Sequence, residues 1–97
     1  MTTFKVAGKA DTNSLAAAIA GCFEDDLSGA VCLHCIGPRS VSTGVKAVAA
    51  AKGMMHRDGM TYAVLIIQPE FVKKQIRGEM LTVVALTVRA ERSQDAD

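Results

Sequence analysis

The segment 36–53 joins two kinds of local sequence that do not belong to one element. An apolar run ends at Ile36, the pair Gly37-Pro38 follows, and a stretch rich in Ala and Val fills the remainder. Glycine and proline indicate a turn, whereas closely spaced Ala residues favour a helix. We therefore expect a strand that ends at Ile36 and a helix that begins near Ser40. Ser40 or Ser42 is expected to cap this helix by accepting a hydrogen bond from a free backbone N–H.

The expected helix has one apolar stripe and lies in an acid-free part of the chain. Its apolar residues recur at helical spacing, and we expect them to form the buried face. They are Val41, Val45, Val48 and Ala49. Lys52 falls on the same stripe, so its aliphatic stem is expected to lie along apolar surface. Segment 27–57 holds no Asp or Glu, and Arg39 stands where the helix opens. A cation beside free N–H groups and the positive end of a helix dipole makes this loop a candidate anion site.

The rest of the chain alternates between strand-like and helix-like segments. Segment 14–26 has the helical spacing of Leu15, Ile19 and Phe23. Strand-like composition is found in segments 4–7, 30–36, 61–67 and 81–89. The third of these strands is apolar throughout from Ala63 to Ile67, which predicts a place in the middle of the sheet. The order β-α-β-α-β-β predicts an α/β domain with two crossovers and a terminal hairpin, whose two strands are linked by segment 68–80.

Length and composition limit the class of protein. Ninety-seven residues make one domain, and with 49% apolar but only 4% aromatic residues its aliphatic core is thin, so we expect part of the stability to come from subunit contacts. Three cysteines without a signal peptide suggest a reducing cytoplasm. No apolar run approaches the ~20 residues that span a bilayer, and no membrane association is expected.

The Cys32-Leu33-His34-Cys35 sequence resembles a metal or redox motif, but strand geometry argues against that function. Residues three apart in a strand point to opposite faces, so Cys32 and His34 share one face and Cys35 lies on the other. His56 stands alone, and no second pair with ligand spacing exists. No carboxylate near the histidines and no nucleophile or phosphate-loop motif indicates catalysis. We expect no metal, no cofactor and no enzymatic activity.

Three blocks of sequence resemble the stage V sporulation protein S family, which is itself similar to the Alba chromatin proteins. The blocks are Lys5-Val6-Ala7-Gly8-Lys9 with Asn13-Ser14-Leu15-Ala16 and Ile19-Ala20-Gly21; Ile36-Gly37 with 44–53; and Pro69-Glu70-Phe71 with Gln75-Ile76 and Gly78-Glu79. The resemblance implies a two-layer Alba-like β-α-β-α-β-β sandwich over residues 1–91, a four-stranded mixed sheet with two helices on one face. The polar composition of residues 92–97 predicts a tail after this domain. The resemblance also implies a dimer or larger homo-oligomer that binds DNA or RNA without strong sequence preference, with a role in sporulation or developmental regulation.

The nucleic-acid contacts implied by the resemblance come from three loops. They lie after the first strand, at the start of the second helix and between the last two strands, and the residues there are Lys9, Arg39, Lys73, Lys74 and Arg77. Cations that converge on one side neutralise phosphates and give sequence-tolerant, salt-sensitive binding. The basic hairpin departs from the acidic hairpin typical of the sporulation proteins. The alternative to phosphate binding, which the sequence leaves open, is that these cations form an ordinary solvated surface.

A second hypothesis is a self-assembling scaffold or protein-interaction module without direct nucleic-acid binding. Small residues give both helices low-relief surfaces. Gly21 costs ~1 kcal/mol relative to Ala in a helix interior, so the close approach of another backbone is expected there. Bulky replacements of Gly21 or Gly44 are expected to disrupt such an assembly.

Overall fold

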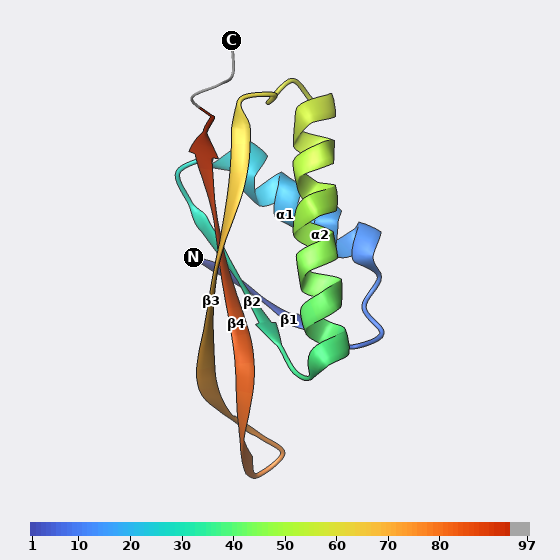
Figure 1. The fold of residues 1–97 in the computed structure, drawn as a ribbon, viewed down its shortest axis with the longest axis vertical. Helices are drawn as coiled ribbons and strands as arrows, with labels where there is room; N and C mark the ends of the chain where they lie inside the picture. Colours follow the sequence, from blue (N-terminus) through green and yellow to red (C-terminus); the bar gives the residue numbers. More distant parts are fainter. Residues whose placement is uncertain (94–97) are drawn as a thin grey trace.

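A computed structural model gives the structure, and it describes residues 1–93 (Figure 1). The elements follow one another in the order β-α-β-α-β-β, which confirms the expected order. Their bounds are β1 (Thr2–Val6), α1 (Thr12–Asp25), β2 (Ala30–Cys35), α2 (Pro38–Arg57), β3 (Ala63–Ile76) and β4 (Glu79–Arg92).

The four strands form one mixed sheet in the order β1-β2-β4-β3. β1 and β2 are parallel, as a helical crossover requires, while β4 runs antiparallel to both β2 and β3. The prediction that the third strand is central is wrong, because β4 takes that place and leaves β3 at the edge of the sheet. β4 is accordingly buried on both faces, with Val83 and Ala85 on one and Leu86 and Val88 on the other.

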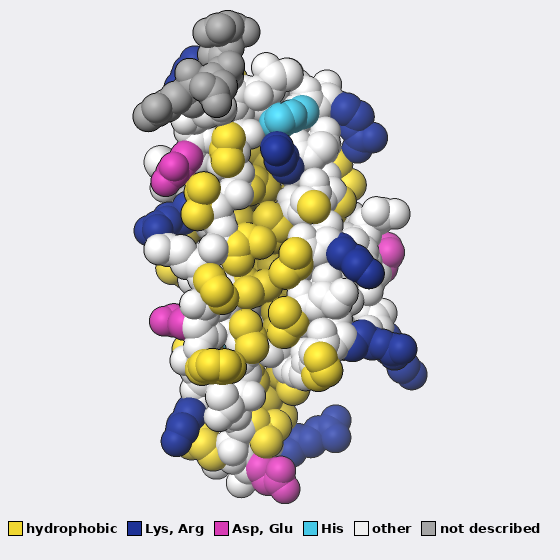
Figure 2. Space-filling view, viewed as in Figure 1, with side chains coloured by type: hydrophobic (Ala, Val, Ile, Leu, Met, Phe, Trp, Pro, Cys, Tyr) yellow, Lys and Arg dark blue, Asp and Glu magenta, His cyan; other side chains and the backbone are white. Residues whose placement is uncertain are grey.

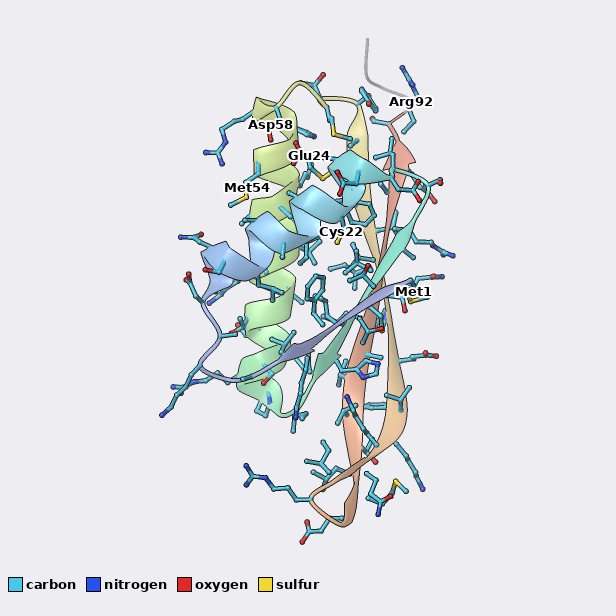
Figure 3. The ribbon with its side chains drawn as sticks, turned by 180° about the vertical axis from the view of Figure 1, so that it is seen from behind. Met1, Cys22, Glu24, Met54, Asp58 and Arg92 are labelled. Atoms are coloured by element: carbon cyan, nitrogen blue, oxygen red, sulfur yellow. The ribbon has the colours of Figure 1, made fainter. Side chains whose placement is uncertain are left out.

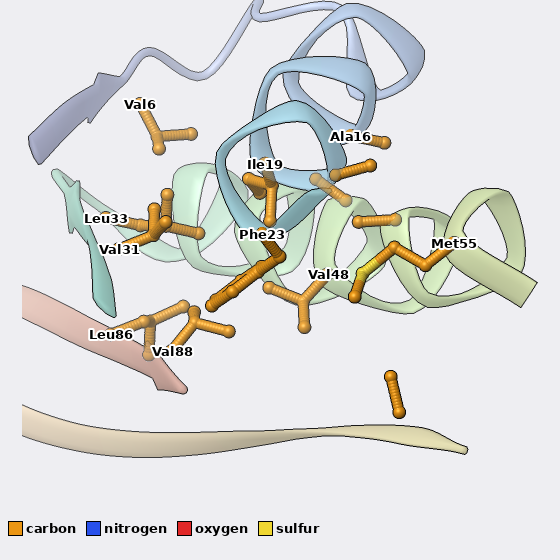
Figure 4. Close-up of a cluster of buried hydrophobic side chains, with 14 of the residues drawn as sticks. Val6, Ala16, Ile19, Phe23, Val31, Leu33, Val48, Met55, Leu86 and Val88 are labelled. Atoms are coloured by element: carbon orange, nitrogen blue, oxygen red, sulfur yellow. The ribbon is translucent and has the colours of Figure 1, made fainter. Parts of the chain in front are cut away.

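Both helices cover the same face of the sheet, and the core lies between them and the strands (Figure 4). Ile19 and Phe23 of α1 are fully buried, as their spacing predicts. They meet Val31 and Leu33 of β2 and Val88 of β4 in a single cluster. Alternation along β2 is also confirmed, because Cys35 belongs to this core while Cys32 lies on the opposite face.

The buried face of α2 differs from the expected one. Its buried residues are Ser40, Gly44, Ala47, Val48, Ala51 and Met55. Only Val48 of the predicted stripe is among them; Val45 is 45% exposed, and Lys52 is exposed as well. The cause is the close approach of α2 to the sheet at Gly44, where an added Cβ would lie 3.1 Å from the Cys35 Sγ. Small residues therefore face the sheet, and the valines are turned partly outward.

The β3–β4 hairpin is much longer than predicted. Both strands contain 14 residues and are paired along their whole length from Ala63 to Arg92, so segment 68–80 is not a loop but forms most of the hairpin's outer half. Only Arg77 and Gly78 form the turn. The hairpin extends beyond the helices and makes the molecule elongated, about 50 × 22 × 20 Å (Figure 1). Arg92, placed in the tail by the sequence, ends β4, and residues 94–97 of the expected tail lie outside the described residues.

Candidate functional site

The start of α2 is built differently from the predicted cap. Gly37 is the N-cap residue with φ +85°, a left-handed conformation that glycine adopts without strain, and Pro38 occupies the first helical position. No side chain caps the helix. Ser40, which the sequence suggested as a cap, instead donates its hydroxyl proton to the Ile36 carbonyl oxygen at 2.7 Å and is buried. The prediction of a serine cap is therefore wrong, although the loop and the helix are confirmed.

Arg39 brings the start of α2 together with the loop after β1. An added Cβ on Gly8 would lie 3.4 Å from the Arg39 Cδ, so the arginine stem lies against the backbone next to Lys9. Lys9 and Arg39 are both exposed. Two of the predicted loops are thus neighbours, and they lie in the half of the molecule that contains the hairpin turn (Figure 1).

The hairpin carries the three other predicted cations, and they do not share one face. Lys73 pairs with Thr82 and lies on the side of the sheet that the helices cover, whereas Lys74 pairs with Leu81 and lies on the opposite side. Arg77 occupies the turn with φ 51°, a conformation that side chains other than glycine seldom adopt. In Figures 1 and 3 this turn, the start of α2 and the β1–α1 loop all lie toward the same end of the molecule.

Lys74 has a specific partner that the sequence did not predict. Its ammonium Nζ lies 3.2 Å from the Nδ1 of His34 in β2. β4 separates the two strands, so the lysine side chain crosses a strand to reach the imidazole. Adjacent lysines in the sequence therefore have different surroundings: Lys73 is exposed, and Lys74 is half-buried.

Acidic residues are present at both ends of the molecule but cluster at the end away from the turn. Near the basic segments lie Asp11, Glu70 and Glu79. The Ser14 hydroxyl donates to the Asp11 carboxylate at 2.6 Å and holds the pKa of Asp11 below its ordinary value. At the other end a hydrogen bond with Asp58 raises the pKa of Glu24, and the two carboxyl groups meet where α1 and α2 terminate (Figure 3). The five predicted cations thus outnumber the acids at the hairpin end.

An apolar surface between α2 and the hairpin was missed by the sequence analysis. A shallow hollow of about 290 Å³ is lined by Pro69, Glu70, Phe71 and Val84. Phe71 is 79% exposed, and the partly exposed Val45 belongs to the neighbouring helix. Figure 2 shows the hydrophobic side chains as a continuous column along this face, with basic side chains on either side. The signal was present in the valines of α2, which we had assigned to the core.

The structure shows no constellation for metal-dependent chemistry within residues 1–93. No three His, Cys, Asp or Glu side chains gather there in a way that could hold a metal ion. Cys32 and Cys35 are free and buried on opposite faces, and burial raises the pKa of the Cys35 thiol, with a further contribution from Cys32. Neither helix of the described chain combines the length and hydropathy needed to cross a membrane.

Comparison with known proteins gives one family and one architecture. The family model described as stage V sporulation protein S matches residues 2–91. Among solved structures, Alba from Thermoplasma volcanium superimposes with a TM-score of 0.54. The match covers 94% of this chain and 100% of the Alba chain at 17% sequence identity. Identity this low shows the fold alone, and that fold is the two-layer Alba-like sandwich expected from the sequence.

Proposed function

The chain belongs to the stage V sporulation protein S family, and from that premise we propose that it binds nucleic acid without catalysing a reaction on it. The contacts are made to the phosphate backbone and depend little on base sequence. The observation that supports the proposal is the position of three basic segments in the same half of the molecule: Lys9 beside Arg39 at the body, and the hairpin with Lys73 and Arg77 extending beyond them. A sporulation-related role fits the description of the family.

The shape of the basic end suits contacts to the backbone of a duplex or a folded RNA better than recognition of individual bases. A narrow two-stranded hairpin that extends past the helices can follow a groove, while Lys9 and Arg39 stay at the body and meet backbone phosphates. Each neutralised phosphate releases counterions, so affinity falls steeply with salt. Phe71 is the exposed aromatic side chain nearest to these cations in the hairpin, which leaves little stacking surface for reading bases.

The test is a salt-titrated binding assay with a short DNA duplex and the RNA duplex of the same sequence. For wild type we expect binding at about 50 mM salt that weakens sharply by about 200 mM. Replacing both Lys73 and Arg77 by Ala removes two phosphate contacts, so the slope of log affinity against log salt should become shallower by about two. The matched control replaces Lys52 and Arg57, two exposed cations toward the other end of α2, and removes the same charge.

Two results would contradict the proposal at different levels. Equal losses for the two double variants would show that only net charge matters and that the hairpin is not the site. Failure of wild-type protein to retain either duplex at low salt would remove the function itself.

The apolar column favours a second, compatible property, which is self-association. Phe71 and Pro69 expose apolar side chains beside one another in the hairpin, Val45 is partly exposed on α2, and Figure 2 shows hydrophobic side chains continuing along this face. Apolar surface of this continuity is typical of an interface. The proposed occupant is a second copy of this chain, because a dimer would bury both columns and place two basic hairpins in one particle. Two hairpins would double the number of phosphate contacts without any new basic residue.

A further inference from the structure

The sheet face that the helices leave uncovered has an unusual polar contact. Lys74 of β3 donates a hydrogen bond to His34 of β2 at 3.2 Å, across the intervening β4. Beneath this contact, Val83 and Ala85 of β4 are each only 1% exposed, although both lie on the uncovered face. Side chains of the flanking strands must therefore bury them, and the crossing lysine stem is in place to do so.

The chemistry of the contact fixes the state of the histidine. A lysine ammonium has three donors and no acceptor, so Nδ1 of His34 must be the acceptor and carries no proton. The imidazole is then neutral, with its proton on Nε2. A doubly protonated imidazolium has donors at both nitrogens and repels the ammonium, so the contact exists only while His34 is neutral. Histidine is the side chain that ordinarily changes its charge between pH 5 and 8.

Other charged side chains on the uncovered face determine its net charge around the His34–Lys74 contact. Lys5 of β1 is the register partner of His34 and lies on the same side of the sheet. Glu70 of β3 lies in the same row, beyond Ala85 of β4. Arg89 lies farther along β4 and is bonded to Gln68, with Glu91 beyond it. Protonation of His34 would place three cations on this face, with Lys5 and His34 in one row and Lys74 farther toward the turn. Glu70 is the acid in the row of His34, and Glu79 of β4 lies on the same face beyond Lys74.

We propose that the His34–Lys74 pair makes this uncovered face an acid-strengthened phosphate-binding surface. The proposal rests on the nucleic-acid binding proposed above and adds its regulation. At neutral pH the pair holds one positive charge, and Lys74 is bound to the imidazole. When His34 takes up a proton, the pair holds two charges, the hydrogen bond is lost, and Lys74 becomes free to reach a phosphate between itself and Lys5. Affinity for a polyanion therefore rises on mild acidification through two neighbouring cations.

The experiment compares duplex binding at about pH 7.5 and about pH 5.5, at constant ionic strength, in three proteins. Wild type should bind about tenfold more tightly at the lower pH, the gain expected from one or two charge-assisted contacts to phosphate. His34→Gln should lose this gain, because the amide oxygen still accepts from Lys74 but does not protonate. His56→Gln is the matched control, since the chain has two histidines and His56 instead donates from Nε2 to the Ala63 carbonyl oxygen at 3.0 Å. It should keep the full gain.

A readout without nucleic acid completes the test. Nitrogen NMR of the free protein should show His34 as the Nε2-protonated tautomer at neutral pH, and Lys74→Met should change its Nδ1 resonance while leaving that of His56 in place. Binding that is equal at both pH values, or a gain that survives in His34→Gln, would overturn this inference and leave the proposed function intact. Absence of binding at both pH values would overturn both.

Discussion

At the scale of single residues, Gly44 decides how closely α2 approaches the sheet. A Cβ at this position would lie 3.1 Å from the Cys35 Sγ and 3.2 Å from the Leu86 Cδ1. Both neighbours are buried, so neither has free space into which to move. The sequence suggested that Gly44 belongs to a surface for self-association, whereas the structure places it inside the fold. Gly21, assigned the same role, has nothing within 4 Å of an added Cβ.

Gly44→Ala should destabilise the protein by about 1–3 kcal/mol, because the extra methyl group overpacks a filled core. Gly53→Ala is the matched control in the same helix, since nothing lies within 4 Å of its added Cβ and the residue is exposed. At position 53 the higher helix propensity of Ala should increase the free energy of unfolding by at most about 1 kcal/mol. Urea unfolding followed by circular dichroism measures both changes. A Gly44→Ala variant as stable as wild type would show that the helix moves freely away from the sheet.

Individual side-chain roles were predictable only where one regular pattern governs them. Strand alternation correctly separated Cys32 from Cys35 and argued against a metal site between them. The role of Ser40 was not predictable in this way, because its partner depends on where the helix begins. Once Pro38 starts the helix, Ser40 is the third residue of its first turn, and its hydroxyl reaches back to the Ile36 carbonyl oxygen. The pairing of Lys74 with His34 depends on sheet order, which the sequence alone did not fix.

At the scale of elements, a substitution in the hairpin turn can separate the charge of Arg77 from its effect on the turn. A two-residue turn with positive φ at both positions favours Asn or Gly, and Arg77 has φ 51° beside Gly78 with φ 81°. Arg77→Asn should therefore raise the melting temperature while weakening duplex binding. The two effects have opposite signs, so one cannot cause the other. Thermal unfolding and the salt-titrated assay measure them.

Two other outcomes would separate the roles of Arg77. Weaker binding together with a lower melting temperature would mean that the arginine supports the turn. Unchanged binding with a higher melting temperature would mean that its charge does not contact the ligand.

The outer half of the hairpin escaped prediction for a physical reason. Beyond the helices neither face of the two strands has a core to pack against, so no apolar alternation marks residues 68–80 as strand. The polar residues in this segment, such as Lys73 and Gln75, are therefore typical of a loop in sequence although they lie in a strand. The opposite error arose at Ala63–Ile67, where a continuous apolar run suggested a central strand. That strand is at the edge, and Ile66 on its uncovered face remains 36% exposed.

At the scale of the whole molecule, the apolar column predicts the oligomeric state. If two copies meet through it, wild-type protein should have twice the 10.2 kDa mass of one chain, and Phe71→Glu should reduce it to a single chain. The glutamate would bury a charge in the interface without a partner. Ile66→Glu is the matched control, because it places the same charge on the same strand but on the opposite face. Light scattering after size-exclusion chromatography measures the mass.

A wild-type protein that elutes as a single chain at all concentrations would contradict the dimer. Equal dissociation of the Phe71 and Ile66 variants would place the interface elsewhere on the sheet.

The architecture as a whole was more predictable than the site. Element order and layer arrangement follow from hydrophobic periodicity and from the family resemblance, and both are confirmed. The candidate site depends on which strand faces of the hairpin the cations occupy, and these faces could not be assigned while segment 68–80 was interpreted as a link rather than as strand. The sequence therefore identified the basic loops of the hairpin end without revealing that Lys73 and Lys74 lie on opposite sides.

The position of β3 at the border of the sheet has a consequence for the behaviour of the protein at high concentration. An edge strand of 14 residues presents unpaired backbone N–H and C=O groups, which can pair with a strand of another molecule and extend the sheet into a fibril. Pro69 interrupts that border near its middle, because it has no N–H to offer to an incoming strand. We therefore expect Pro69, which also lines the apolar hollow, to oppose the addition of further strands at this edge and, with it, fibril formation in concentrated solution.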